Sequence, residues 1–186
     1  MKIGIDGRVF MGHRTGVGRY ITELCSHLDP FLTDARFIVY SPVPLSIPFP
    51  SDRWTLHIDP NPLASRLKAI AWLKTMCGRL CADDRPDVFW ATSVFLPSLH
   101  RHTRIVSTVY DLNHLYFPQS MGTSHRLAYH LFFKNDLARS DRITTISEGT
   151  AHKLVRHIHC SKPTVLLPAV SDQFRRPEPS LINDFR

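Results

Sequence analysis

Hydrophobic residues in this chain gather into short runs that alternate with longer amphipathic stretches. The short apolar runs predict strands at Lys2–Asp6, Arg36–Ser41, Trp54–Ile58, Asp87–Ala91, Arg104–Asp111, Asp141–Ser147 and Pro163–Pro168. In the longer stretches apolar residues recur three or four positions apart, which predicts helices over about Gly18–Leu28, Pro62–Cys81, Ser124–Arg139 and Glu148–Ile158. This alternation predicts an α/β fold with a mostly parallel sheet and helices on both faces.

Polar residues follow several of these predicted strands. Ligands of parallel sheets bind beyond the carboxyl ends of the strands. Those ends carry Asp6, Ala91–Ser93, Asp111 and Ser147–Glu148, which are therefore the candidate site. Each also has a structural alternative. Asp111 could cap the next turn, Ser147 fits the N-cap of a helix, and Glu148 suits the dipole of that helix.

The loop after the first strand, "GHRTGVGRY", is rich in glycine and basic residues. Free N–H groups at Gly16, Val17 and Gly18 would suit an anion at a helix start, and Arg8 and Arg14 would add positive charge. The loop is neither a Walker A motif nor a dinucleotide fingerprint, because the required Gly-Lys-Ser/Thr ending and the third glycine are missing. A tight turn with close helix packing would use the same glycines.

The composition narrows the class of protein. The 186 residues suit one large domain, and a net charge of +7 favours anionic partners such as phosphorylated substrates, lipid headgroups or nucleic acid. No nucleic-acid motif is present, so we expect no nucleic-acid partner. The N-terminus lacks a signal peptide and no run could cross a bilayer, which predicts a cytoplasmic protein. Four irregularly spaced cysteines indicate reduced thiols, and we expect no metal site, because the Cys and His spacings do not fit zinc.

The predicted helix Pro62–Cys81 has a broad apolar face with Trp72 and four basic residues. A helix of this composition suits contact with an anionic membrane surface, which would leave Trp72 or its apolar neighbours exposed beside Lys68, Lys74 or Arg79. Covering the protein core is the commoner use of an amphipathic helix, and we favour that interpretation.

Five segments that follow one another along the chain are "IGIDGRVFMGHRTGVGRYITEL", "PDVFWATSVFLPSL", "VSTVYDLNHLYFP", "ARSDRITTISEGTAHKL" and "VLLPAVSDQFRRP". In their order and spacing they resemble family 4 glycosyltransferases of the GT-B fold. The resemblance covers nearly the whole chain and implies a Rossmann-like, acceptor-binding N-terminal domain over residues 1–170. Residues 171–186 would begin the linker to a second, donor-binding domain. Without that domain, which carries most nucleotide-sugar contacts in the family, we expect the chain to be inactive alone.

The resemblance implies a retaining enzyme that moves a sugar, such as mannose from GDP-mannose, to a polysaccharide or glycolipid acceptor, without a cofactor. The acceptor could be lipid-linked, which would bring the enzyme to the inner face of the cell membrane. Asp111 would be the catalytic residue that orients hydroxyls. Many relatives have His where this chain has Tyr110, and a phenol with a pKa near 10 cannot replace it as a base. Substrate binding would fall to Arg8, Arg14, Gly16, Val17, Gly18, Tyr110, Ser147 and Glu148. The alternative is a stand-alone Rossmann-like module that binds a nucleotide or an acidic partner without catalysis.

Overall fold

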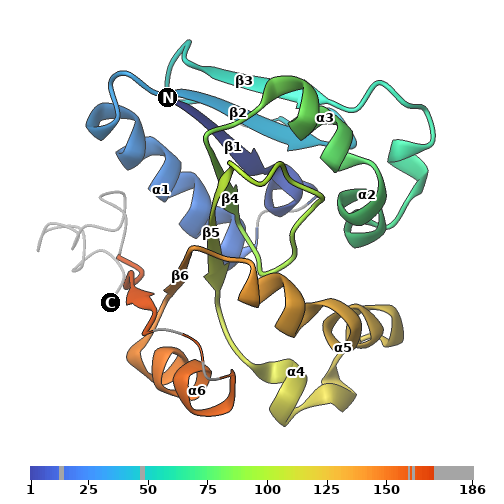
Figure 1. The fold of residues 1–186 in the computed structure, drawn as a ribbon, viewed down its shortest axis with the longest axis vertical. Coiled ribbons are helices and arrows are strands. Elements are labelled where there is room, and N and C mark those ends of the chain that lie inside the picture. The colour runs from blue at the N-terminus through green and yellow to red at the C-terminus, as the bar shows by residue number, and fades with distance from the viewer. Residues whose placement is uncertain (13–14, 47–48, 159, 161, 170–186) are drawn as a thin grey trace, which may run out of the picture.

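A computed structural model describes residues 1–12, 15–46, 49–158, 160 and 162–169 of the chain. These residues form a single sheet with helices on both faces (Figure 1). The strands are β1 (Lys2–Asp6), β2 (Arg36–Ser41), β3 (Trp54–Ile58), β4 (Val88–Ala91), β5 (Arg104–Val109), β6 (Arg142–Thr145) and β7 (Thr164–Val165). The helices are α1 (Gly16–Phe31), α2 (Ala69–Thr75), α3 (Cys77–Asp84), α4 (Asn113–Tyr116), α5 (Thr123–Ala138) and α6 (Glu148–Ile158). Short 3-10 turns are η1 (Gly7–Phe10), η2 (Ala64–Arg66) and η3 (Pro118–Ser120).

All seven strands run parallel, in the order β3-β2-β1-β4-β5-β6-β7. The central strand β1 pairs Ile5 with Val39 of β2 on one side and with Trp90 of β4 on the other. The strand order reverses its direction between β1 and β4. This is the Rossmann-like topology, and it confirms the predicted fold class. In such sheets the crevice for a ligand lies outside the carboxyl ends of the two strands at the reversal.

Two apolar clusters cover the two faces of the sheet. On one face, α1 places Ile21 and Cys25 against Ile3, Ile5 and the stacked rings of Phe37 and Trp54. On the other face, α2, α3, α5 and α6 pack over residues of β4, β5 and β6. Short strands buried on both faces read as continuous apolar runs, which is why they could be found from the sequence.

The predicted single helix over Pro62–Cys81 is wrong. The segment is divided into η2, α2 and α3, with breaks at Leu67–Lys68 and at Met76. Breaking the helix turns both Trp72–Leu73 and the Cys77–Leu80–Cys81 group toward the sheet, and each of these five side chains is buried. Tertiary packing also brings the backbone of α3 close to a loop, since a Cβ at Gly78 would lie only 2.9 Å from the carbonyl oxygen of Ser98.

The favoured interpretation, in which this segment covers the core, agrees with the position of Trp72, whereas the membrane alternative would have exposed it. Trp72 is fully buried, and its indole Nε1 donates a hydrogen bond of 2.7 Å to Oδ2 of Asp59. Lys74 is ion-paired with Asp136. The segment therefore covers the core, although Leu63 and Leu67 at its start are exposed. No helix among the described residues is both long and apolar enough to cross a bilayer.

Candidate functional site

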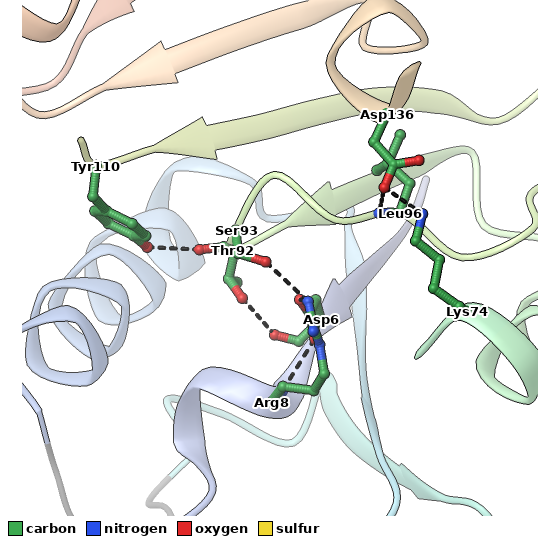
Figure 2. A network of polar contacts seen from close by, with 8 residues as sticks. All are labelled: Asp6, Arg8, Lys74, Thr92, Ser93, Leu96, Tyr110 and Asp136. Carbon is green, nitrogen blue, oxygen red and sulfur yellow. Dashed lines mark hydrogen bonds and ion pairs between the residues drawn. The ribbon is translucent and has the colours of Figure 1, made fainter. Parts of the chain in front are cut away.

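A network of polar contacts joins the ends of β1 and β4 at the reversal point of the sheet (Figure 2). Asp6, the last residue of β1, is buried, and its carboxylate accepts from Nε (2.8 Å) and Nη2 (2.6 Å) of Arg8. Nη2 of Arg8 also donates to Oγ of Ser93, just after β4, over 2.9 Å. The charge of Arg8 is thus balanced by Asp6, and its guanidinium fastens the β1 turn to the β4 loop. Contact between Arg8 and a substrate stays a prediction.

The network continues to the ends of β5 and β6. The hydroxyl of Tyr110, the residue after β5, donates to the carbonyl oxygen of Thr92 over 2.7 Å, and Thr92 in turn donates to the carbonyl of Asp6 (Figure 2). The carbonyl of Tyr110 accepts from Oγ1 of Thr150 in α6. Burial raises the pKa of Tyr110 well above its usual value. Tyr110 therefore links strand ends as a neutral hydrogen-bond donor.

The start of α1 lies at the same edge, because α1 follows β1. Thr15 is its N-cap, and its hydroxyl accepts from the N–H of Gly18 over 3.1 Å. Gly18 serves close packing, because a Cβ there would meet the carbonyl oxygen of Val9 at 3.1 Å. A Cβ at Gly16 would meet nothing within 4 Å, and the N–H groups of Gly16 and Val17 precede the first intrahelical bond, from Arg19 to Thr15. Arg14, predicted to bind substrate, lies outside the described residues.

Asp111 stands exposed just after β5. Its Oδ1 accepts from the backbone N–H of Asn113 and its Oδ2 from the Asn113 amide, each over 2.9 Å. Asp111 therefore caps the turn that follows it, which is the structural alternative given for this residue. A carboxylate has about four acceptor positions, and these two bonds fill only part of them. Asp111 is thus held in one orientation with capacity for further donors, and its catalytic role stays a prediction.

Ser147 and Glu148 begin α6. The hydroxyl of Ser147 accepts from the N–H of Thr150 over 3.1 Å and donates to its hydroxyl, so the N-cap interpretation is confirmed. Glu148 is exposed in the first turn, where its charge suits the helix dipole. The all-parallel sheet places Gly16, Asp111 and Ser147 at one edge, and Ser147 reaches Tyr110 through Thr150.

A second buried cluster holds the loop after β4 in place. Oδ2 of Asp136 in α5 accepts from the N–H of Leu96 over 3.0 Å and pairs with Nζ of Lys74 in α2 (Figure 2). Arg139 lies 3.7 Å from the other carboxylate oxygen. The cluster therefore fixes the loop that also carries Thr92 and Ser93 to two helices far apart in the sequence.

A comparison of the chain with known protein families agrees with its Rossmann-like fold. Residues 14–174 match Glycosyltransferase Family 4, a span that includes most of the chain. The chain belongs to glycosyltransferase family 4. The family implies a nucleotide-sugar donor and an acceptor. A search among curated proteins found no match.

Two other features of this family 4 domain do not fit a sugar or a metal. A small hollow between α1 and the β2–β3 loop is lined mainly by apolar side chains, from Phe10, Thr22, Cys25, Val39, Phe49, Pro50 and Trp54. Its one hydroxyl, on Thr22, already donates to the carbonyl of Gly18, so the hollow offers little to a polar sugar. Within the described residues no three His, Cys, Asp or Glu side chains are grouped to hold a metal, and all four cysteines are free thiols.

Sequence reasoning did not assign roles to Lys74, Asp136 and Thr150. For Asp136 a signal was present, since it falls between Phe133 and Leu137 on the apolar face of the predicted helix. An acidic residue on such a face needs a buried partner. Its partner Lys74 lies 62 positions away, so the sequence could not identify it. Thr150 carries a weaker signal, as a hydroxyl three residues after a predicted N-cap.

The imidazole of His114 in α4 predicts a pH dependence of stability. It packs against Tyr129 and Phe133 of α5, at centroid distances of 4.5 and 4.1 Å, and neither of its buried nitrogens has a hydrogen-bond partner among the described residues. Burial lowers the pKa of His114 from its usual 6.5, against a smaller opposing effect of Asp111. The unfolded chain therefore takes up the proton first as pH falls.

We accordingly expect His114 to reduce the stability of the protein as the pH falls below about 6.5, while its contribution is unchanged above that pH. His114→Phe should keep the ring packing and lose less stability than the wild type on acidification, measured by denaturant unfolding at neutral and acidic pH. His152→Phe, at an exposed position, is the control. An unchanged pH profile in His114→Phe would contradict the prediction.

Proposed function

We propose that this domain forms the acceptor side of a retaining glycosyltransferase. The enzyme moves a sugar, such as mannose from GDP-mannose, to a hydroxyl of a polysaccharide or glycolipid, as in lipopolysaccharide synthesis. The observation that supports this most is the meeting of the β1, β4 and β5 ends with the start of α1 at the reversal point of the sheet, in a chain of family 4.

The N–H groups of Gly16 and Val17 supply hydrogen bonds to the leaving diphosphate. They are positioned before the first intrahelical bond of α1, so they have no acceptor within the helix itself. Negative charge develops on the leaving group as the sugar–phosphate bond breaks, and fixed N–H dipoles stabilise such charge without reorganising. The side-chain direction at Gly16 is open, which leaves room for the phosphate to approach.

Asp111 orients a sugar or acceptor hydroxyl by accepting a hydrogen bond from it. Its two bonds to Asn113 fix the carboxylate, so the substrate meets an acceptor that is already in place. Tyr110 takes no part in proton transfer, since its hydroxyl donates to Thr92 and its pKa is raised. Arg8, Ser147 and Glu148 contribute to binding at the edge, Arg8 mainly by holding the β1 turn against Ser93.

The transfer also needs a second, donor-binding domain, because the resemblance to family 4 assigns most nucleotide-sugar contacts to such a domain. Residues 1–186 expressed alone are expected to show no measurable transfer. The decisive assay incubates the full-length protein with a panel of nucleotide sugars and detects transfer to glycan and lipid-linked acceptors. Absence of transfer with every donor, while a nucleotide still binds, would favour a non-catalytic binding module.

Replacing Asp111 separates its proposed catalytic role from its capping role. In the full-length enzyme Asp111→Ala should lower turnover about a hundredfold, the range found when a positioned polar group of an active site is removed. Asp111→Asn should lower turnover similarly but keep a side-chain oxygen to cap Asn113. Both should unfold within about 1 kcal/mol of the wild type, since the side chain is exposed.

Asp83→Ala is the matched control, since it removes an exposed carboxylate at the other end of the sheet. It should change neither turnover nor stability. If Asp111→Ala unfolds much more easily while its turnover per folded molecule stays normal, the residue is only a cap.

A further inference from the structure

Large apolar side chains are exposed along the segment from α4 to α5. Of the thirteen such side chains exposed among the described residues, five fall between residues 115 and 131. They are Leu115, Tyr116, Phe117, Leu127 and Leu131, which we call the α4–α5 apolar group. Leu127 and Leu131 are each 56% exposed. Isolated exposed apolar residues are common, but such a concentration within one segment, from α4 to α5, indicates a contact surface.

The two leucines lie on the solvent side of α5, opposite the buried residues Ala128, Phe133 and Leu137. The helix is therefore apolar on two sides, one facing the core and one facing solvent. Core packing accounts for the first side only. No described segment covers the second, because both leucines are more than half exposed.

The charge around the leucines is of one sign. Arg126, His130 and Lys134 follow one another at four-residue steps beside Leu127 and Leu131, and all three are exposed. The helix has one acidic residue, Asp136, which is buried and paired with Lys74. The exposed side of α5 thus combines apolar residues with cations and carries no carboxylate.

The neighbouring elements add further aromatic and basic side chains, although the exposed carboxylates of Asp111 and Glu148 lie just before α4 and at the start of α6. The ring of Tyr116 packs under Nζ of Lys153 of α6, at 4.9 Å, and its hydroxyl bonds with Nε2 of His157 over 2.8 Å. α4 is joined to α5 through the stacking of His114 on Tyr129. In Figure 1, α4, α5 and α6 lie at one end of the molecule, and α4 directly follows the carboxyl end of β5.

We propose that the α4–α5 apolar group, with Arg126, Lys134 and Lys153 around it, docks this protein on an anionic lipid bilayer. Leucine and aromatic side chains enter the boundary between headgroups and acyl chains, while the basic side chains pair with lipid phosphates. The contact deepens the proposed function, because a lipid-linked acceptor has to be reached at a bilayer. Docking in this way places the carboxyl edge of the sheet, with Asp111, beside the bilayer.

The test measures flotation of the full-length protein with vesicles, in the absence of any sugar donor. Vesicles of phosphatidylcholine mixed with phosphatidylglycerol should bind the protein, and added salt should weaken the binding. Arg126→Gln with Lys134→Gln should weaken it about 30-fold, since each basic residue near an anionic surface contributes roughly fivefold. Leu127→Ser with Leu131→Ser should weaken it at least about tenfold.

Matched controls carry the same changes elsewhere. Phe31→Ser alters an apolar residue that is 80% exposed at the far end of α1, and Arg36→Gln with Arg101→Gln removes two exposed charges. Both controls should bind like the wild type. Equal binding to pure phosphatidylcholine, no binding to either vesicle, or equal losses in the controls would overturn the proposal.

Two other occupants of the surface are separated by the same variants. If the leucine variant instead abolishes a dimer seen by light scattering, and no vesicle binds, the surface joins two copies of the chain and the proposal is overturned. If the full-length protein floats with anionic vesicles but transfers no sugar in the assay, the proposed function is refuted and the proposal of membrane docking stands. Transfer to a water-soluble acceptor should be unaffected by the leucine changes.

Discussion

Asp136→Ala is expected to lower the free energy of unfolding by about 3–5 kcal/mol, the range for breaking a buried ion pair by removing one partner. The side chain of Asp136 is 1% exposed and that of Lys74 is 16% exposed. Alanine would leave an ammonium group enclosed without its anion, and the N–H of Leu96 without its acceptor. Burial already lowers the pKa of Lys74, and the Asp136 carboxylate acts in the opposite direction.

Denaturant unfolding at neutral pH measures this effect. Lys74→Met combined with Asp136→Leu should recover much of the loss, because apolar residues of similar size often replace a buried pair without cost. Arg104→Ala, which removes the largely exposed cation of the Arg104–Asp141 pair, should cost about 1 kcal/mol or less. A loss below about 1 kcal/mol in Asp136→Ala would show that the pair contributes little to the fold.

Arg8→Ala is the second change with a large expected effect, again about 3–5 kcal/mol. Asp6 is 1% exposed, and Arg8 supplies both side-chain donors to its carboxylate. Removing the guanidinium leaves a buried negative charge whose one remaining donor among the described residues is the backbone N–H at residue 8. It also frees Ser93, so the β4 loop loses its contact with the β1 turn.

Arg8→Lys keeps the charge but not the two-pronged geometry, so it should recover only part of the stability. In the full-length enzyme both variants should lower turnover more than the unfolding equilibrium accounts for, since the network sets the positions of the strand ends. Unfolding free energy and turnover at saturating donor are the measurements, with Arg36→Ala as the exposed control. Normal turnover in folded Arg8→Ala would mean that the contact is structural alone.

The parts of the fold that the sequence predicted depend on local patterns. The bounds of β1, β2, β3 and α6 agree with the predicted ranges, and β4, β5 and β6 lie within them. α1 begins two residues earlier and ends three later than predicted, and its N-cap is Thr15. In these segments apolar periodicity and a capping hydroxyl agree, so nearby residues suffice to fix the structure.

The sequence predicted which edge of the sheet carries the candidate site, but it predicted few of the contacts between the residues there. Parallel strands bring their carboxyl ends together wherever they lie in the sequence, which is why Asp111 and Ser147 could be assigned to the edge that carries Gly16. The pairing of Arg8 with Asp6 and Ser93 could not be foreseen. It depends on the separation of two loops that meet only when β1 and β4 pair.

The sequence by itself determined which segments are strands, that the sheet is parallel, and that the chain resembles family 4, because each follows from residues close together or from motifs in order. Tertiary structure alone decided which apolar residues are buried or exposed and which distant charged residues pair. It broke the segment Pro62–Cys81 at Met76 to bury Trp72, joined Lys74 to Asp136, and left Leu127 and Leu131 exposed. An amphipathic pattern gives the apolar positions of a helix, but whether each is buried depends on elements that arrive from elsewhere in the chain.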